Sequence, residues 1–327
     1  MEKLEVALIA PTRNSPLPRS APGATFPVHP HREHRMDLDF TAYVARKKSG
    51  VSGERGEGYA FEGDLKVLRA LRKVRPLELA IAQTVKLSKA VVTGDLLGTA
   101  VKVGPTQFPR IHRIVERCAK TLGIAPPQVY IVPRMDSYNA YTFGTDDDAF
   151  IVIHALLAEQ FSDDELEFVI GHECGHIQNN HVVYLTTLVR IQQVMQMSAG
   201  LLAPLLMPLQ LALQSWARAA EITCDRAGLL CCKSPEAAVR SFARLAVGSP
   251  KLFAEMNVTA YLAQLGEGRE GIGRVGELTK THPYVTKRIE ALRIFTASAL
   301  YQQSLGRDGG DVREELERKT SDLIKVL

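Results

Sequence analysis

The sequence carries little net charge of either sign. Its 40 Lys and Arg residues stand against 36 Asp and Glu residues, which leaves a formal charge of +4, and no dense basic run occurs. A protein that binds nucleic acid electrostatically needs clustered positive charge to contact the phosphates. The composition therefore argues against a nucleic-acid partner, and the 46% share of hydrophobic residues is ordinary for a soluble globular protein.

Paired cysteines and a secretory signal are also missing. The five cysteines are odd in number and have neither the spacing of a disulfide framework nor that of a four-cysteine zinc site. The first residues contain only a short apolar run at 6–10, which is too brief for the hydrophobic part of a secretory signal. Both absences favour a reducing compartment, and we predict a cytoplasmic location.

A long uncharged stretch raises the question of a membrane span. No charged residue occurs between Ile191 and Ala217. Pro204 and Pro208 divide this stretch into halves of about thirteen residues, each near 20 Å as a helix and short of the roughly 30 Å hydrocarbon core. We therefore predict an apolar helical hairpin near residues 185–217 that covers the active-site domain or forms a homo-oligomer interface. Membrane association is the alternative.

Residues 1–57 are rich in Pro, Gly, Arg and His and show no sustained helical or strand periodicity. We predict that they form a poorly ordered N-terminal extension, followed by one domain over residues 58–327. The extension could restrain a peptide-binding cleft by lying in it as a pseudo-substrate. A solvated tail is the simpler interpretation.

The remaining chain shows mainly helical patterns with a few β-branched runs. Leucines at three-residue spacing begin a helix near residue 64, and Gly123 followed by two prolines ends another. The predicted helices are 64–74, 77–92 and 108–122, and the predicted strands are 128–133, 139–144 and 149–153. Strands in the middle of an otherwise helical chain indicate an α+β fold, mostly helical with a small sheet.

One further helix carries the motif with the strongest chemical meaning. Residues 162–165 form a capping box, which starts a helix that runs to about residue 180. In its middle stands His172-Glu-Cys-Gly-His176, the HExxH pattern. Histidines at i and i+4 project from one helical face and can bind one ion, while Glu173 can reach a water in the open coordination position. Cys174, inside the motif, is interpreted as a packing residue.

A catalytic zinc site needs a third protein ligand. The longer metzincin motif would require Gly at position 179 and His at position 182, but the sequence has Asn179 and Val182 there. His181 is one position out of register, and we interpret it as a polar residue near the helix end.

A glutamate on a later helix is the other route to a third ligand. Glu221 and Asp225 share one helical face. We predict that His172, His176 and Glu221 hold one zinc ion per chain. Asp225 is predicted to accept the outer N–H of a ligating histidine, which would fix the tautomer of that ring.

The order of these motifs resembles a known family. His172–His176, followed after a long interval by Glu221–Asp225, is similar to the gluzincins that include the CAAX prenyl proteases and the HtpX-type heat-shock proteases. Asn139-Ala140 followed by Gly144 resembles the substrate-side strand of that family, and His282–Arg288 resembles its late His-Pro element. The resemblance covers roughly residues 64–292.

The resemblance implies zinc, hydrolysis of peptide bonds, and a peptide or protein substrate. It also implies that His282 and Arg288 lie near the developing oxyanion. The strand with Asn139, Ala140 and Tyr141 would bind substrate at a sheet edge.

We therefore predict a zinc-dependent endopeptidase with Glu173 as general base. Two alternatives stay open: a zinc-containing peptide-binding or chaperone-like protein with little proteolysis, and a membrane-associated quality-control protease. The Gly-rich string at 266–271 follows a helical pattern instead of a strand, so we interpret it as a loop and not as a dinucleotide site.

Overall fold

The computed structural model describes residues 56, 58–72, 94, 96, 98–145, 148–198, 200–267 and 282–325. The chain divides into a unit of residues 1–51, which lies outside the described residues, and a unit of residues 52–327. The predictions for the N-terminal extension, for a helix at 77–92 and for the Gly-rich loop fall wholly or mostly outside these residues.

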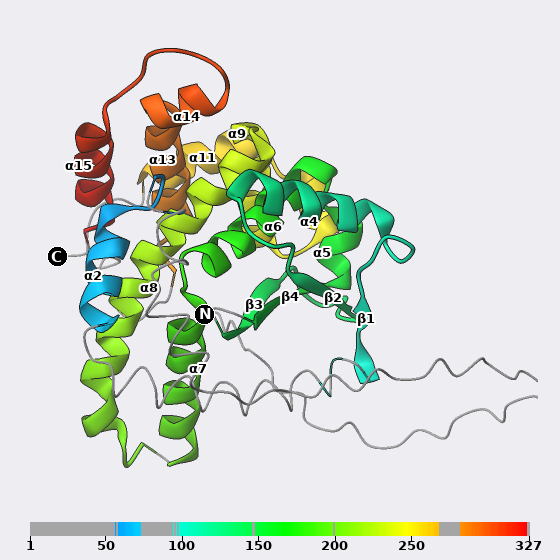
Figure 1. The fold of residues 1–327 in the computed structure, drawn as a ribbon, viewed down its shortest axis with the longest axis vertical. Helices are drawn as coiled ribbons and strands as arrows, with labels where there is room; N and C mark the ends of the chain where they lie inside the picture. The colour runs from blue at the N-terminus through cyan, green and yellow to red at the C-terminus, as the bar shows by residue number, and fades with distance from the viewer. Residues whose placement is uncertain are drawn as a thin grey trace, which may run out of the picture. The chain divides into compact units, whose positions relative to one another are not determined.

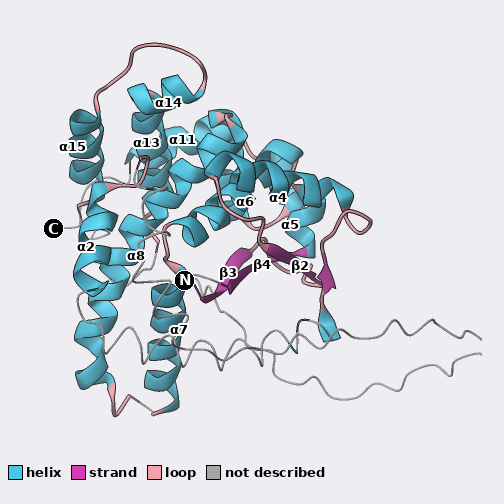
Figure 2. Ribbon diagram, in the orientation of Figure 1, coloured by secondary structure: helices cyan, strands magenta, loops and turns pink. Residues whose placement is uncertain are grey.

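The described part of the second unit is mostly helical, with one small sheet (Figures 1 and 2). The helices are α2 (Glu62–Arg72), α4 (Pro109–Leu122), α5 (Ala155–Gln160), α6 (Asp163–Gln178), α7 (Val182–Met197), α8 (Ala203–Cys232), α9 (Pro235–Val247), α10 (Pro250–Glu255), α11 (Val258–Glu267), α13 (Val285–Thr296), α14 (Ala299–Ser304) and α15 (Arg313–Ile324). The strands are β1 (Val101–Lys102), β2 (Gln128–Val132), β3 (Ala140–Thr145) and β4 (Asp148–His154). The predicted α+β fold is confirmed.

The sheet has the strand order β1-β2-β4-β3, with β2 and β4 parallel and both outer strands antiparallel to their neighbours. Ile131 and Ile151 face the core shared with helices α4 and α6, while Tyr130 and Val152 are buried on the other face. Burial on both faces explains why β2 and β4 read as continuous apolar runs. The two-residue β1 is too short to leave a signal in the sequence.

Helix α6 lies beside this sheet and is buried along almost its whole length (Figure 2). The predicted capping box is confirmed: the Ser162 hydroxyl accepts a hydrogen bond from the Glu165 N–H at 3.3 Å, and the Glu165 carboxylate accepts one from the Ser162 N–H at 2.8 Å. Glu165 is itself buried and pairs with Arg240 and Arg244 on α9. The helix that carries the HExxH motif is therefore fixed at its start.

Helices α7 and α8 form a hairpin over the uncharged stretch, with the turn between Met197 and Ala203. The uncharged stretch divides at the turn just before Pro204, but the division expected at Pro208 is wrong. Pro204 lies in the first turn of α8, where the missing N–H is tolerated, and Pro208 lies inside α8. Among the described residues, no helix combines the length and the apolar character needed to cross a membrane.

Candidate metal centre

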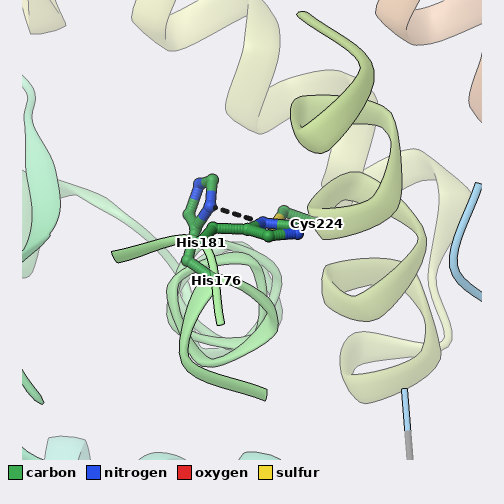
Figure 3. A group of neighbouring side chains, drawn as sticks. All are labelled: His176, His181 and Cys224. Atoms are coloured by element: carbon green, nitrogen blue, oxygen red, sulfur yellow. Dashed lines mark hydrogen bonds between the residues drawn. The ribbon is translucent and has the colours of Figure 1, made fainter. Parts of the chain in front are cut away.

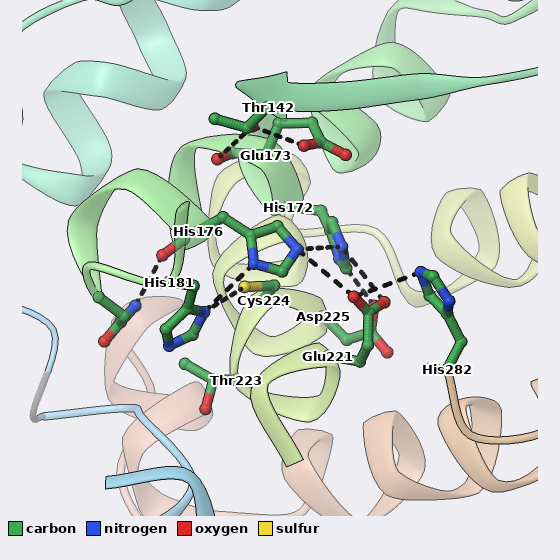
Figure 4. Close-up of polar contacts among 12 residues, drawn as sticks. Thr142, His172, Glu173, His176, His181, Glu221, Thr223, Cys224, Asp225 and His282 are labelled. Carbon is green, nitrogen blue, oxygen red and sulfur yellow. Dashed lines mark hydrogen bonds and ion pairs between the residues drawn. The ribbon is translucent and has the colours of Figure 1, made fainter. Parts of the chain in front are cut away.

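Helices α6 and α8 bring three potential ligands together in the interior (Figure 4). The Nε2 atoms of His172 and His176, on α6, lie 3.2 Å apart. The carboxylate of Glu221, on α8, lies 3.5 Å from His172 Nε2 and 3.4 Å from His176 Nε2. All three side chains are buried. The structure thus places the three residues predicted as ligands with their donor atoms pointing at one another.

This donor set fits a divalent metal ion. Two imidazole nitrogens and a carboxylate are the usual ligands of a catalytic zinc ion. Burial raises the pKa of Glu221, but the interactions with His282, with the Arg288 cation and with the two histidines outweigh it and hold that pKa well below its ordinary value. One carboxylate oxygen, Glu221 Oε2, is buried and accepts no hydrogen bond, although the Arg288 guanidinium lies 3.1 Å from it. An ionised, incompletely satisfied carboxylate against two imidazoles is what a cation would complete.

The two histidines predicted as ligands differ in their electrostatic surroundings. Burial lowers the pKa of His176 below its ordinary value, which favours the neutral form that a metal requires. Burial also lowers the pKa of His172, but the charges of Glu221 and Asp225 outweigh it and raise that pKa above its ordinary value. A proton on His172 therefore competes with a metal at this centre.

The approach of α6 to α8 depends on glycine. A Cβ atom on Gly228 would lie 2.6 Å from the carbonyl oxygen of Phe168, and one on Gly175 would lie 2.8 Å from the Cβ of Ala227. These distances are shorter than carbon–oxygen and carbon–carbon contacts allow. The small residues therefore permit the spacing at which ligands on two separate helices meet.

We expect Gly228→Ala to lower the free energy of unfolding by roughly 1–3 kcal/mol, because the new methyl group overpacks the contact between the helices. Metal affinity should fall with it as α8 moves away from α6. Thermal unfolding and metal titration of the full chain measure both effects. Gly98→Ala is the matched control, since Gly98 is helical and an added Cβ there meets no atom within 4 Å. Equal stability of the two variants would contradict the role of Gly228.

Asp225 lies at the outer nitrogen of His172, with Asp225 Oδ1 at 3.0 Å from His172 Nδ1. The guanidinium of Arg288 donates to both carboxylate oxygens of Asp225 and lies 3.1 Å from Glu221 Oε2. His282 Nε2 lies 3.4 Å from Glu221 Oε1, and the His282 side chain is 37% exposed. Arg288 is thus engaged with the carboxylates beside the centre, whereas His282 reaches it from the solvent side. Their roles at an oxyanion stay a prediction.

Glu173 turns from α6 toward the outer strand β3 (Figure 4). The hydroxyl of Thr142, on β3, donates a hydrogen bond of 2.6 Å to Glu173 Oε2. Asn139 immediately precedes this strand, and Ala140 and Tyr141 lie on it. Thr142 was not among the residues predicted from the sequence. The two-residue period of a strand could have identified it, because Thr142 lies on the same face of the predicted strand as Ala140.

His181 lies near the helix end, as interpreted from the sequence, but its contacts there were not predicted. It is fully buried between the end of α6 and the start of α7. Its Nδ1 lies 3.2 Å from His176 Nδ1 and 3.6 Å from the Sγ of Cys224 (Figure 3). Cys174, by contrast, is fully buried, and burial raises the pKa of its thiol well above the ordinary value. This agrees with its interpretation as a packing residue.

The sequence is similar to known metallopeptidases. The family described as "Peptidase family M48" matches residues 105–295, which include every residue of the centre described above. The chain is 32% identical over 183 residues to "Plastoglobule-localized metallopeptidase 48, chloroplastic" of Arabidopsis thaliana, across 54% of this chain and 52% of that protein. It is 26% identical over 214 residues to "Protease HtpX homolog" of Salinibacter ruber, across 59% of this chain and 76% of that protein. The match therefore spans about half the length of the Arabidopsis relative.

Proposed function

Since the chain belongs to peptidase family M48, we propose that it is a zinc-dependent endopeptidase in which His172, His176 and Glu221 hold one zinc ion. The observation that carries the proposal is the convergence of these donors from two helices, with Glu173 adjacent on α6. Metal analysis and digestion of a peptide library by the wild type and by Glu173→Gln test it.

When bound, zinc supplies a Lewis acid that lowers the pKa of a water molecule and polarises the scissile carbonyl. Glu173 accepts the proton of the attacking water on its carboxylate and delivers it to the leaving amine. Thr142 holds that carboxylate through the 2.6 Å hydrogen bond to Oε2, which fixes its direction toward β3. Asp225 keeps the proton of His172 on Nδ1, so that Nε2 presents its lone pair to the metal.

An extended substrate would pair with the outer strand β3. The N–H of His154 donates to the carbonyl of Asn139 at 2.9 Å, which makes these two residues a hydrogen-bonded pair. Such pairs alternate in an antiparallel ladder, so the backbone groups of Tyr141 also point to β4. Those of Ala140 and Thr142 point away from β4, to the edge of the sheet beside Glu173. They are the groups we propose for substrate pairing.

We expect Ala140→Pro to raise KM for peptide substrates by about 2–10-fold, because it removes one main-chain hydrogen bond worth roughly 0.5–1.5 kcal/mol. Proline is tolerated where the lost N–H faces a sheet edge. Steady-state kinetics on one extended peptide measures the change. Tyr141→Pro is the opposite control, since it removes an N–H that pairs with β4 and should lower the thermal midpoint. An unchanged KM in Ala140→Pro would exclude pairing of substrate at this position.

A chaperone-like protein would also use the metal site and the peptide-binding strand β3, but it would not need Glu173 as a general base. The hydrogen bond from Thr142 to Glu173 favours hydrolysis, because it positions a carboxylate beside the metal centre. Cytoplasmic location, with membrane association as its alternative, stays a prediction, as does homo-oligomerisation. The apolar side chains exposed at the hairpin turn, Met197, Leu201 and Leu205, form the surface on which an oligomer or membrane contact would depend.

A further inference from the structure

The outer nitrogens of the two ligating histidines meet different partners. His172 Nδ1 contacts the carboxylate of Asp225 directly, at 3.0 Å. His176 Nδ1 contacts a second imidazole, His181 Nδ1, at 3.2 Å. On the far side of that ring, His181 Nε2 lies 3.0 Å from Asp64 Oδ2, at ion-pair distance. A carboxylate therefore stands behind each proposed ligand histidine, Asp225 directly behind His172 and Asp64 behind His176 through His181. Figure 4 shows Asp225 beside His172 and His181 beside His176.

Asp64 is a fully buried carboxylate that the proposed reaction does not use. It comes from the first turn of α2, far from the motif in sequence. The indole N–H of Trp216 donates to Oδ1 at 2.9 Å, and the hydroxyl of Thr223 donates to Oδ2 at 2.7 Å. Burial raises the pKa of Asp64, but His181 and these two hydrogen bonds outweigh it and hold that pKa below its ordinary value. The charge is therefore retained in the interior, where a carboxylate needs a partner.

The positions of the protons follow from metal ligation through Nε2 of His176. A metal at that atom uses its lone pair, so the ring carries its proton on Nδ1. The facing atom, His181 Nδ1, must then accept this hydrogen bond, and the proton of His181 lies on Nε2, facing Asp64. One tautomer of each ring is selected, and the chain of contacts ends on a fixed negative charge.

We propose that His181 and Asp64 are positioning residues that hold His176 in the tautomer and orientation for the metal, as Asp225 does for His172. The proposal rests on the proposed metal site. Outer partners of this kind orient the ring and raise the basicity of the ligand. Asp64 lies outside the segment matched to the peptidase family, residues 105–295. The packing of α2 therefore contributes a residue to the surroundings of the proposed metal site.

A second metal ion between His176, His181 and Cys224 is the competing explanation for this cluster, since their donor atoms lie within 4.8 Å of one another (Figure 3). Such a site would need the thiolate of Cys224. A second ion on His176 Nδ1 would also require that ring to lose its remaining proton and bridge two metals, because Nε2 is already a ligand in the proposed site. The 3.2 Å contact between His176 Nδ1 and His181 Nδ1 therefore favours a relay of contacts from His176 through His181 to Asp64, with the Cys224 thiol beside it.

The test is zinc affinity of the full chain, measured by chelator competition on variants whose folding is checked by circular dichroism. We expect Asp64→Asn and His181→Leu to weaken zinc binding by about 10–100-fold while the stoichiometry stays at one. His181→Gln should retain most of the affinity, because an amide can accept from His176 and donate to Asp64. The absorption spectrum of the cobalt-substituted protein should shift in the first two variants and stay close to wild type in the third.

Ser298→Ala is the matched structural control. Ser298 is buried and caps α14, where its hydroxyl accepts a hydrogen bond of 3.3 Å from the Tyr301 N–H, away from α2 and from the contacts of His181. We expect this variant to lower the thermal midpoint and to leave zinc affinity and the cobalt spectrum unchanged.

Wild-type affinity in both Asp64→Asn and His181→Leu would overturn the relay. If His181→Leu does not fold, the near-isosteric Asp64→Asn decides alone. Two zinc ions per wild-type chain, one of them lost in Cys224→Ser, would also overturn it in favour of a second metal site. A wild-type chain that binds no zinc would instead refute the proposed function, which separates that failure from failure of the relay.

Discussion

We expect Glu173→Gln to lower the rate of peptide hydrolysis by about 10²–10⁴-fold, the usual contribution of general acid–base catalysis. The amide keeps the shape of the side chain and can still contact Thr142, but it cannot accept the proton of the attacking water. Metal content should stay at the wild-type level, because Glu173 points to β3 and is not among the converging donors. Initial rates on a peptide library and elemental analysis of the same samples measure both quantities.

Glu159→Gln is the matched control for this prediction. Glu159 lies on helix α5, is exposed, and accepts a hydrogen bond from its neighbour Gln160. The same chemical change at this position should therefore leave activity intact. Full activity in Glu173→Gln would refute the assignment of the base. A wild-type chain that binds peptides and zinc but cleaves nothing would support the chaperone-like alternative instead.

The parts of the centre that could be predicted are those set by local geometry. His172 and His176 are four residues apart on one helix, so the helical period alone places them together. The capping box marked the beginning of that helix for the same reason. Glu221 could not be placed by helical periodicity, because spacing along the sequence does not give the distance between α6 and α8. It was predicted as a ligand from the acidic pair at i and i+4 and from the family resemblance.

The parts that could not be predicted depend on contacts between distant segments. Asp64 reads in the sequence as an ordinary acidic residue in the first turn of a helix, yet tertiary packing buries it against Trp216 and Thr223. His181 was interpreted from its position relative to the metzincin motif. That position does not reveal which residues of α8, such as Cys224 and Trp216, pack against the ring. Pro208 was expected to divide the uncharged stretch together with Pro204, but α8 continues through it because packing can override the cost of one lost hydrogen bond.

The proposed third ligand, Glu221, also reaches the centre only through the packing of α8 against α6. We expect Glu221→Ala to weaken zinc binding by more than the roughly 10–100-fold associated with an outer partner, because two imidazoles alone leave the site with one ligand too few. Hydrolysis should fall in proportion to the metal lost. Elemental analysis after dialysis against a weak chelator measures the content per chain, with one equivalent expected for the wild type.

Glu221 also neutralises positive charge in the interior, so its removal must be separated from simple unfolding. Arg288 keeps its two hydrogen bonds to Asp225 in the variant, which limits the damage. Glu221→Gln preserves the volume of the side chain and removes only the charge, and it should weaken metal binding less than Glu221→Ala. Glu236→Gln, on the exposed start of α9, is the control for the chemical change. Full zinc retention by a folded Glu221→Ala protein would show that the third ligand is another residue.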